Sequence, residues 1–184
     1  MSLRVNNLTG FGANRVQEST VMDELSNMTI DSSGWDGYTI KIKTDSATMT
    51  APSFAISNMR FTFKGGISEG CKIAKCYVGH QAASGEEYDA DSFTQITFNA
   101  GDAFGVATAL DTISSDWINF VWDKSKNLIF SAYFDDATKD NIVIAAGLGN
   151  YFYKTGDEAS LVDASGYTSS GGNLGLIGKI EAMR

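Results

Sequence analysis

The sequence predicts an all-β fold, a two-sheet antiparallel β-sandwich of jelly-roll-like character with an N-terminal extended arm. Three observations carry this prediction. Short runs of alternating apolar and polar residues recur at intervals of 8 to 20 residues, as in antiparallel sheets. Clusters of Gly, Ser, Asp and Asn separate them, and the 184-residue chain holds 19 glycines against one proline, Pro52. An apolar fraction of 43% is enough for one well-filled core.

Residues 1–32 differ in composition, and we expect them to form an assembly arm ahead of a β-sandwich domain over residues 33–184. They are mostly polar, but Met22, Leu25 and Met28 recur at helical spacing. A short amphipathic helix and an extended arm are both compatible with this pattern.

The first strand of the predicted domain places Tyr38, Ile40 and Ile42 on one face and polar residues on the other, which is typical of a half-buried strand. Phe61 and Phe63 alternate with polar neighbours in the same way. Further strands are expected over residues 73–78, 93–98, 117–122, 128–134, 142–146, 151–154 and 174–182. We expect residues 117–134 to form a hairpin at the centre of the core, with DKSKN as its connection.

The two cysteines, Cys71 and Cys76, are five residues apart. On a regular strand an odd spacing puts them on opposite faces, which excludes a disulfide. No further Cys or His pattern completes a zinc site. Free, buried thiols in a reducing compartment are expected.

The charge distribution argues against nucleic acid as a partner, because 14 basic residues are scattered among 22 acidic ones, for a net charge of −8. The N-terminus lacks the apolar core of a signal peptide, and no apolar run approaches the length of a membrane span. We therefore expect synthesis in the bacterial cytoplasm and no membrane insertion.

Residues able to carry chemistry are few. His80 is the one histidine, at a strand end, and no serine lies in a nucleophile elbow. Acidic residues gather in one loop (Glu86, Glu87, Asp89, Asp91) and in another (Asp135, Asp136, Asp140). Such loops could hold paired acids of a glycosidase or a calcium ion, with Glu87, Asp89 and Asp91 as the weak calcium candidates, but solvated loops are the simpler interpretation. No cofactor, no metal and no enzymatic activity are predicted.

Three aromatic residues are candidates for binding. Trp35 lies in the turn-like segment SSGWDGY, and Tyr151 and Tyr153 share one face of a strand. A row of aromatic rings on a sheet is a common platform for sugar rings, although subunit contacts use the same residues.

The segments YVGHQAASG (77–85), SDWINF (115–120) and KNLIFSAYF (126–134), with the tail from Tyr151 to Met183, resemble β-sandwich virion proteins of tailed phages and phage-like gene transfer agents. The opening VNNLTGFGA is similar to the starts of small virion proteins. A weaker resemblance links the chain to the accessory β-sandwich of SGNH-type esterases, whose catalytic residues lie in a separate domain that this chain lacks.

The resemblance implies a non-enzymatic structural protein of a phage-like particle, of the head-spike base type that anchors a fibre. It implies that the chain forms a homo-oligomer and contacts other virion proteins, capsid or fibre. A tail or baseplate protein is one alternative. A carbohydrate-binding module that recognises host surface polysaccharide through Trp35, Tyr151 and Tyr153 is another.

Overall fold

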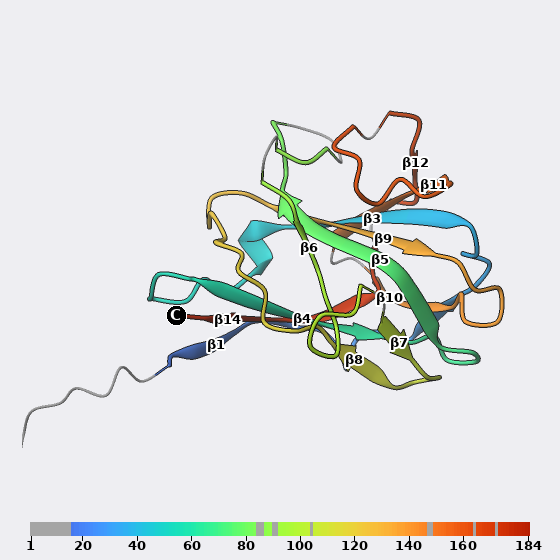
Figure 1. The fold of residues 1–184 in the computed structure, drawn as a ribbon, viewed down its shortest axis with the longest axis horizontal. Helices are drawn as coiled ribbons and strands as arrows, with labels where there is room; N and C mark the ends of the chain where they lie inside the picture. The colour runs from blue at the N-terminus through green and yellow to red at the C-terminus, as the bar shows by residue number, and fades with distance from the viewer. Residues whose placement is uncertain are drawn as a thin grey trace, which may run out of the picture.

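The computed structural model describes residues 16–83, 87–89, 92–103, 105–146, 149–163, 165–171 and 173–184, except for the side chains of residues 149, 173 and 174. The all-β class and the antiparallel β-sandwich are confirmed (Figure 1). One short 3-10 turn, η1 (Ser46–Thr48), interrupts the strands of this described part. The strands are β1 (Glu18–Asp23), β2 (Ile30–Ser32), β3 (Tyr38–Thr44), β4 (Asn58–Lys64), β5 (Cys71–His80), β6 (Thr94–Gln95), β7 (Gly105–Ala107), β8 (Thr112–Ser114), β9 (Leu128–Phe134), β10 (Ile142–Ala146), β11 (Gly149–Thr155), β12 (Thr168–Ser169), β13 (Asn173–Gly175) and β14 (Ile177–Met183).

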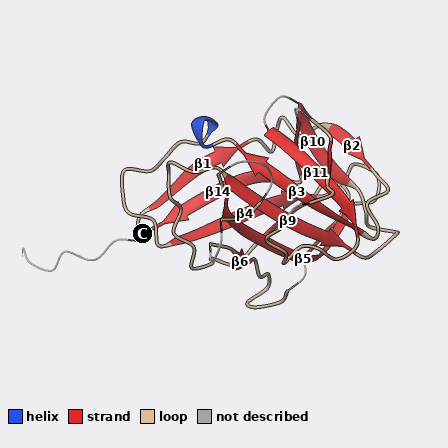
Figure 2. Cartoon of the chain, turned by 90° about the horizontal axis from the view of Figure 1, so that it is seen from above, coloured by secondary structure: helices blue, strands red, loops and turns tan. Residues whose placement is uncertain are grey.

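Two layers make up the sandwich: they lie one above the other in Figure 1, and Figure 2 looks down on them. One is the large sheet, in the order β12-β11-β3-β9-β5-β6, with β7 also paired to β5. The other joins a four-stranded sheet, β1-β14-β4-β8, to a three-stranded sheet, β13-β10-β2. The joint lies where β13 passes into β14 through Leu176, whose φ is 64°, and where Gly65 after β4 bridges Ile142 of β10. All of the strand pairs are antiparallel.

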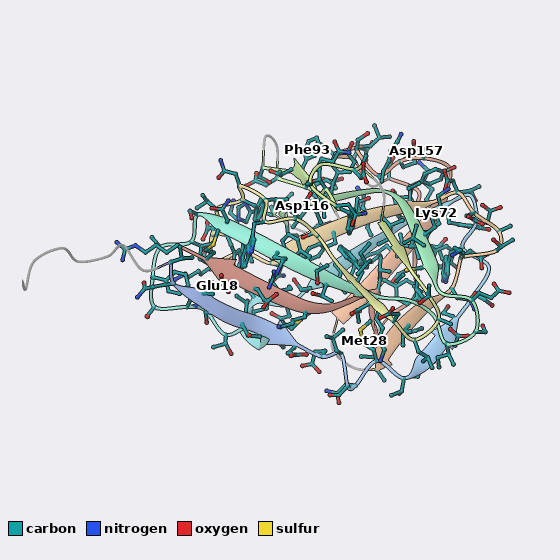
Figure 3. The ribbon with its side chains drawn as sticks, turned by 60° about the horizontal axis from the view of Figure 1, so that its bottom comes forward. Glu18, Met28, Lys72, Phe93, Asp116 and Asp157 are labelled. Carbon is teal, nitrogen blue, oxygen red and sulfur yellow. The ribbon has the colours of Figure 1, made fainter. Side chains whose placement is uncertain are left out.

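The N-terminal part of the described chain belongs to the sandwich, so the predicted boundary at residue 32 is wrong. β1 pairs with β14 at the sheet edge where Figure 3 labels Glu18, and β2 pairs with β10. A bulge in β1 lets two consecutive residues, Val21 and Met22, both turn into the core. Residues 1–15 of the predicted arm lie outside the described residues.

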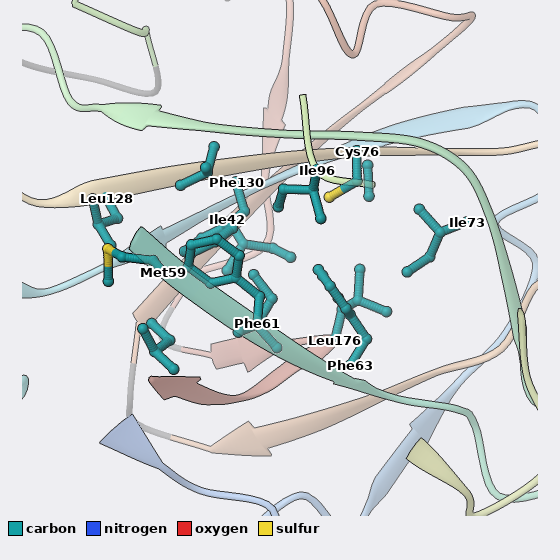
Figure 4. Close-up of a cluster of buried hydrophobic side chains, with 14 of the residues drawn as sticks. Ile42, Met59, Phe61, Phe63, Ile73, Cys76, Ile96, Leu128, Phe130 and Leu176 are labelled. Atoms are coloured by element: carbon teal, nitrogen blue, oxygen red, sulfur yellow. The ribbon is translucent and has the colours of Figure 1, made fainter. Parts of the chain in front are cut away.

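The core lies between the inner faces of the two layers (Figure 4). Phe61 of β4 meets Phe130 of β9 edge to face, with ring centroids 4.9 Å apart and planes at 75°. Phe63 meets Phe98 at 5.6 Å. The predicted alternation is confirmed on the core side of both β3 and β4, because Ile40, Ile42, Phe61 and Phe63 are all fully buried.

The predicted hairpin over residues 117–134 is wrong. In the first half of the predicted hairpin, residues 117–122, only Ile118 forms a β-bridge, and its partner is Met59. The second half is β9, which pairs with β3 and β5 and not with residues 117–122. Phe120 and Trp122 are buried although their backbone is not in a strand, and the Trp122 indole donates a hydrogen bond to the Lys126 carbonyl at 3.0 Å. The segment is therefore a loop whose apolar side chains pack into the core. Alternation of apolar and polar residues does not distinguish such a loop from a strand. The strand expected over residues 93–98 likewise shortens to β6.

Both cysteines of β5 face the core, which corrects the prediction of opposite faces. The register of β5 against β9 shifts between Ile73 and Lys75, so one extra residue sits in the strand. This bulge reverses the alternation, and Cys71 and Ile73 before it point the same way as Cys76 after it. The thiols are free and buried as expected, and burial raises the pKa of Cys71 to about 12.

The outer face of the large sheet is also covered over β3, so the prediction that β3 is half-buried is wrong. Thr39 and Lys41, on the face opposite the core, are both fully buried. The segment after β11 lies over them: Thr39 Oγ1 donates to the Gly156 carbonyl at 2.6 Å, and Lys41 Nζ donates to the Leu161 carbonyl at 3.0 Å. The Lys41 ammonium also lies 5.0 Å from the ring centre of Tyr88.

Candidate functional site

A hollow among the described residues lies where two loops leave neighbouring strands of the large sheet. β5 ends at His80 and β9 begins at Leu128, and these two residues are paired. The loops that follow β5 and precede β9 are therefore held side by side. Between them is a hollow of about 470 Å³, called the loop hollow below. Its lining consists of Gln81, Ala82, Ala83, Asp89, Ser125, Lys126 and Asn127.

Two side-chain amides form the floor that joins the loops. The Gln81 N–H donates to the Asn127 carbonyl at 2.9 Å, and Asn127 Nδ2 donates to Gln81 Oε1 at 2.7 Å. Asn127 Oδ1 in turn accepts from the Ser46 N–H at 2.8 Å, which ties η1 to the same point. These bonds hold both side-chain amides in place.

An ion pair closes one side of the loop hollow. Lys126 Nζ bonds Asp89 Oδ2, and both side chains remain about two-fifths exposed. This hydrogen bond raises the pKa of Lys126 above its usual value. Ser125 lies beside the pair, with its hydroxyl 2.6 Å from Asp123 Oδ1.

His80 has a structural role next to this hollow. Its Nε2 accepts a hydrogen bond from the Asp123 backbone N–H at 2.8 Å, so the proton of the neutral ring is on Nδ1. The ring packs on Phe120 at 5.1 Å between centroids, and burial lowers the pKa of His80. Because Nε2 is already occupied, that atom does not act as a general base in this arrangement.

The first acidic loop does not assemble the predicted calcium ligands among its described members. Asp89 is the partner of Lys126, whereas Glu87 is exposed and contributes its backbone carbonyl to the Ala82 N–H at 2.9 Å. Asp91 and Glu86 lie outside the described residues. Within the described ranges, no group of three or more His, Cys, Asp or Glu side chains is placed to hold a metal ion.

The acids of the second loop have separate roles. Asp135 forms an ion pair with Lys72 at 2.9 Å. Asp136 accepts hydrogen bonds from Thr138, which lower the pKa of that carboxyl. The carboxylate of Asp140 accepts from the Asp36 N–H at 3.3 Å.

The predicted aromatic residues do come together, but as a packed cluster. Trp35 lies 5.8 Å from Tyr151 and 5.3 Å from Tyr153, with ring planes at 85° and 70°. Trp35 and Tyr151 are only 9% and 6% exposed, and the Trp35 indole donates to Ser32 Oγ at 3.2 Å. Buried rings set edge to face offer no flat platform to a sugar, so two of the three predicted platform residues belong to the core.

The edge of this cluster borders a second, shallower hollow of about 370 Å³. Tyr38 and Tyr153 line it, together with Lys154 and Thr168. It is open and lies where β11 pairs with β12.

Sequence reasoning missed most of the loop hollow. The sequence points to Asp89 as one of a group of acids, but it does not indicate that Gln81, Ser125, Lys126 and Asn127 line a site. The signal that could find three of them is the segment DKSKN (123–127), a polar stretch between two apolar ones, which sequence reasoning assigns to a hairpin connection.

No family model matches the chain, and no curated protein is detectably similar to it. None of the helices in the described part of the chain has the length and apolar character needed to cross a membrane.

Proposed function

We propose that the chain is a non-enzymatic structural component of a phage-like particle, a surface protein of the head-spike base type that anchors a fibre. It works by shape, as a rigid sandwich that presents its loops to neighbouring virion proteins. A place in the tail or baseplate is the alternative within the same class.

The non-enzymatic part of the proposal rests on His80, the side chain best suited to acid–base chemistry, because its contacts are structural. Its Nε2 accepts a hydrogen bond from the Asp123 backbone N–H, and its ring packs on Phe120. Asp116, likewise, accepts from Thr97 Oγ1 at 2.8 Å and from the Ala100 N–H at 2.9 Å, which holds a tight turn. Such groups support a scaffold better than a catalyst.

The place in a particle rests on the resemblance of residues 77–134 and of the tail to β-sandwich virion proteins. The described geometry is compatible with it in one respect: the chain enters and leaves the sandwich at one edge, where the Arg184 N–H donates to the Gln17 carbonyl at 3.0 Å. The large sheet and its covering loops are thereby left for other contacts.

The test is to tag the chain in its bacterium and to sediment the particles that the cells release. We expect the tag to co-purify with DNA-filled particles, and to follow the heads when heads and tails are separated. In solution the purified chain should form a trimer or pentamer. A tag that stays in the lysate while intact particles lack it would refute the structural role, and one that follows the tails would move the chain there.

The non-enzymatic part has its own test. Purified protein incubated with capsular polysaccharide or acetylated glycans should release neither reducing ends nor acetate. Turnover that disappears in Glu87→Gln or Asp89→Asn would make the chain an enzyme instead.

A further inference from the structure

We propose that His80 makes the turn over residues 123–126 sensitive to acid. While its ring is neutral it holds this turn against the end of β5, and when the ring binds a proton the turn is released although the sandwich stays folded. The proposal concerns a conformational change within this chain. It does not depend on where the chain sits in a particle.

A single ring joins the turn to the large sheet. His80 is the last residue of β5, and its Nε2 accepts a hydrogen bond from the Asp123 backbone N–H at 2.8 Å. The same ring packs on Phe120 at 5.1 Å between centroids. The turn itself is closed by the Lys126 N–H, which donates to the Asp123 carbonyl at 2.9 Å. Residues 123–125 are exposed, so little packing resists a movement of the turn away from the sheet.

Protonation of the ring removes the acceptor on which this contact depends. A neutral imidazole has a hydrogen on one nitrogen and a lone pair on the other, whereas both nitrogens of the imidazolium carry hydrogens. The protonated Nε2 would therefore point its own N–H at the N–H of Asp123, and two donors at 2.8 Å repel each other. The packing of the ring on Phe120 involves no hydrogen bond. The bond to Asp123 is thus the interaction that acid breaks.

The surroundings of the ring decide which form of the turn binds the proton more tightly. Burial is the largest influence and lowers the pKa of His80, while the carboxylates of Asp123 and Asp89 raise it and the ammonium of Lys126 lowers it. These are the charged groups that face the ring from the turn and from the segment after β5, within the described residues. Release of the turn exposes the ring to water, so its pKa returns toward 6.5. Acid therefore shifts the equilibrium toward the released form.

One proton has enough effect to release the turn but not to unpack the loop that carries it. A pKa difference of one unit between two forms shifts their equilibrium tenfold. A single hydrogen bond contributes a comparable factor. Phe120 and Trp122 are only 4% and 3% exposed, and the burial of each side chain contributes more than tenfold. Both side chains therefore stay in the core when the turn moves.

The experiment measures amide hydrogen exchange in the full chain by NMR between pH 7 and pH 5. The result is expressed as a protection factor, the intrinsic exchange rate divided by the observed rate. We expect the protection factor of the Asp123 amide to fall about tenfold for each pH unit below 6.5, until the folded pKa of His80 is reached. Urea far below the unfolding midpoint should leave this value unchanged, because a local opening exposes little surface.

Ile118 provides the control within the same segment. Its N–H donates to the Met59 carbonyl at 2.9 Å, away from His80. At pH 5 its protection factor should remain at least tenfold above that of Asp123, because the sandwich is still folded when the turn is released.

Two variants assign the effect. His80→Gln keeps an acceptor in place of Nε2 but does not titrate, so the protection of Asp123 should be the same at pH 7 and at pH 5. Lys124→Ala removes the bonds from this ammonium to the carbonyls of Pro52 and Phe54, which do not titrate. It should lower the protection of Asp123 by a similar factor at every pH and leave the pH dependence in place.

A protection factor of Asp123 that does not change between pH 7 and pH 5 overturns the proposal. So does an equal fall in His80→Gln, since it would assign the effect to another group. Equal protection of Asp123 and Ile118 at each pH would overturn it as well, because the turn would then open only when the whole chain unfolds. This comparison needs no variant, so it decides the matter even if His80→Gln fails to fold. None of these results bears on particle assembly, which the tagging experiment decides separately.

Discussion

Replacing Phe130 with alanine should lower the free energy of unfolding by about 3–5 kcal/mol. The side chain is fully buried on β9, between β3 and β5. Removing it from water contributes about 1.5–3 kcal/mol, and the remainder comes from the cavity that the surrounding strands cannot close. The edge-to-face contact with Phe61, at 4.9 Å, adds about 0.5–1.5 kcal/mol beyond burial.

Urea unfolding followed by tryptophan fluorescence measures these free energies. Val121→Ala, at a position 62% exposed, is the matched control and should change stability by no more than about 0.5 kcal/mol. Phe61→Leu and Phe130→Leu, alone and together, should show a coupling of about 0.5–1.5 kcal/mol, since the two rings touch across the sandwich. A loss below about 1 kcal/mol in Phe130→Ala, where about 3 or more is expected, would mean that the two sheets do not pack through this pair.

Three further outcomes are expected. The pKa of His80 in the folded protein lies below 6.5, its value in the unfolded chain, so as the pH falls the unfolded chain binds the proton first. The free energy of unfolding should therefore be highest above pH 6.5 and should decrease as the pH drops toward the folded pKa. In His80→Asn that slope should vanish, and a slope that persists would contradict the assignment. Cys71 and Cys76, buried with raised pKa, should react with a thiol reagent only as fast as the protein unfolds, and rapid modification of the native protein would be the contrary result. A chain that begins at Glu24 loses β1 with its buried Val21 and should unfold at a lower urea concentration than the full chain; equal midpoints would show that β1 does not stabilise the sandwich.

The fold class and much of the core could be predicted from the sequence because a strand alternates its side chains between two faces. Ile40 and Ile42, and Phe61 and Phe63, point into the core as that period requires. Tyr151 and Tyr153 share a face, also as predicted. Each of these statements concerns residues close together in one strand.

The candidate site could not be predicted in the same way. Gln81 and Asn127 meet only because β5 and β9 pair, and nothing local in either segment indicates that pairing. The turn-like segment around Trp35 makes it a candidate binding residue in the sequence, yet Trp35 is buried against Tyr151 and Tyr153, which are more than 100 residues away in the chain.

The sequence by itself determined that this chain is an acidic, antiparallel β-protein with a well-filled core, because composition and local periodicity are properties of short segments. Only the tertiary structure decided which faces are covered. One extra residue in β5 turned Cys76 to the same side as Cys71, and a distant loop buried Lys41 on the face that alternation had assigned to solvent. Burial is set by whatever packs on a strand from elsewhere in the chain, and neither a bulge nor a covering loop leaves a periodic trace in the strand itself.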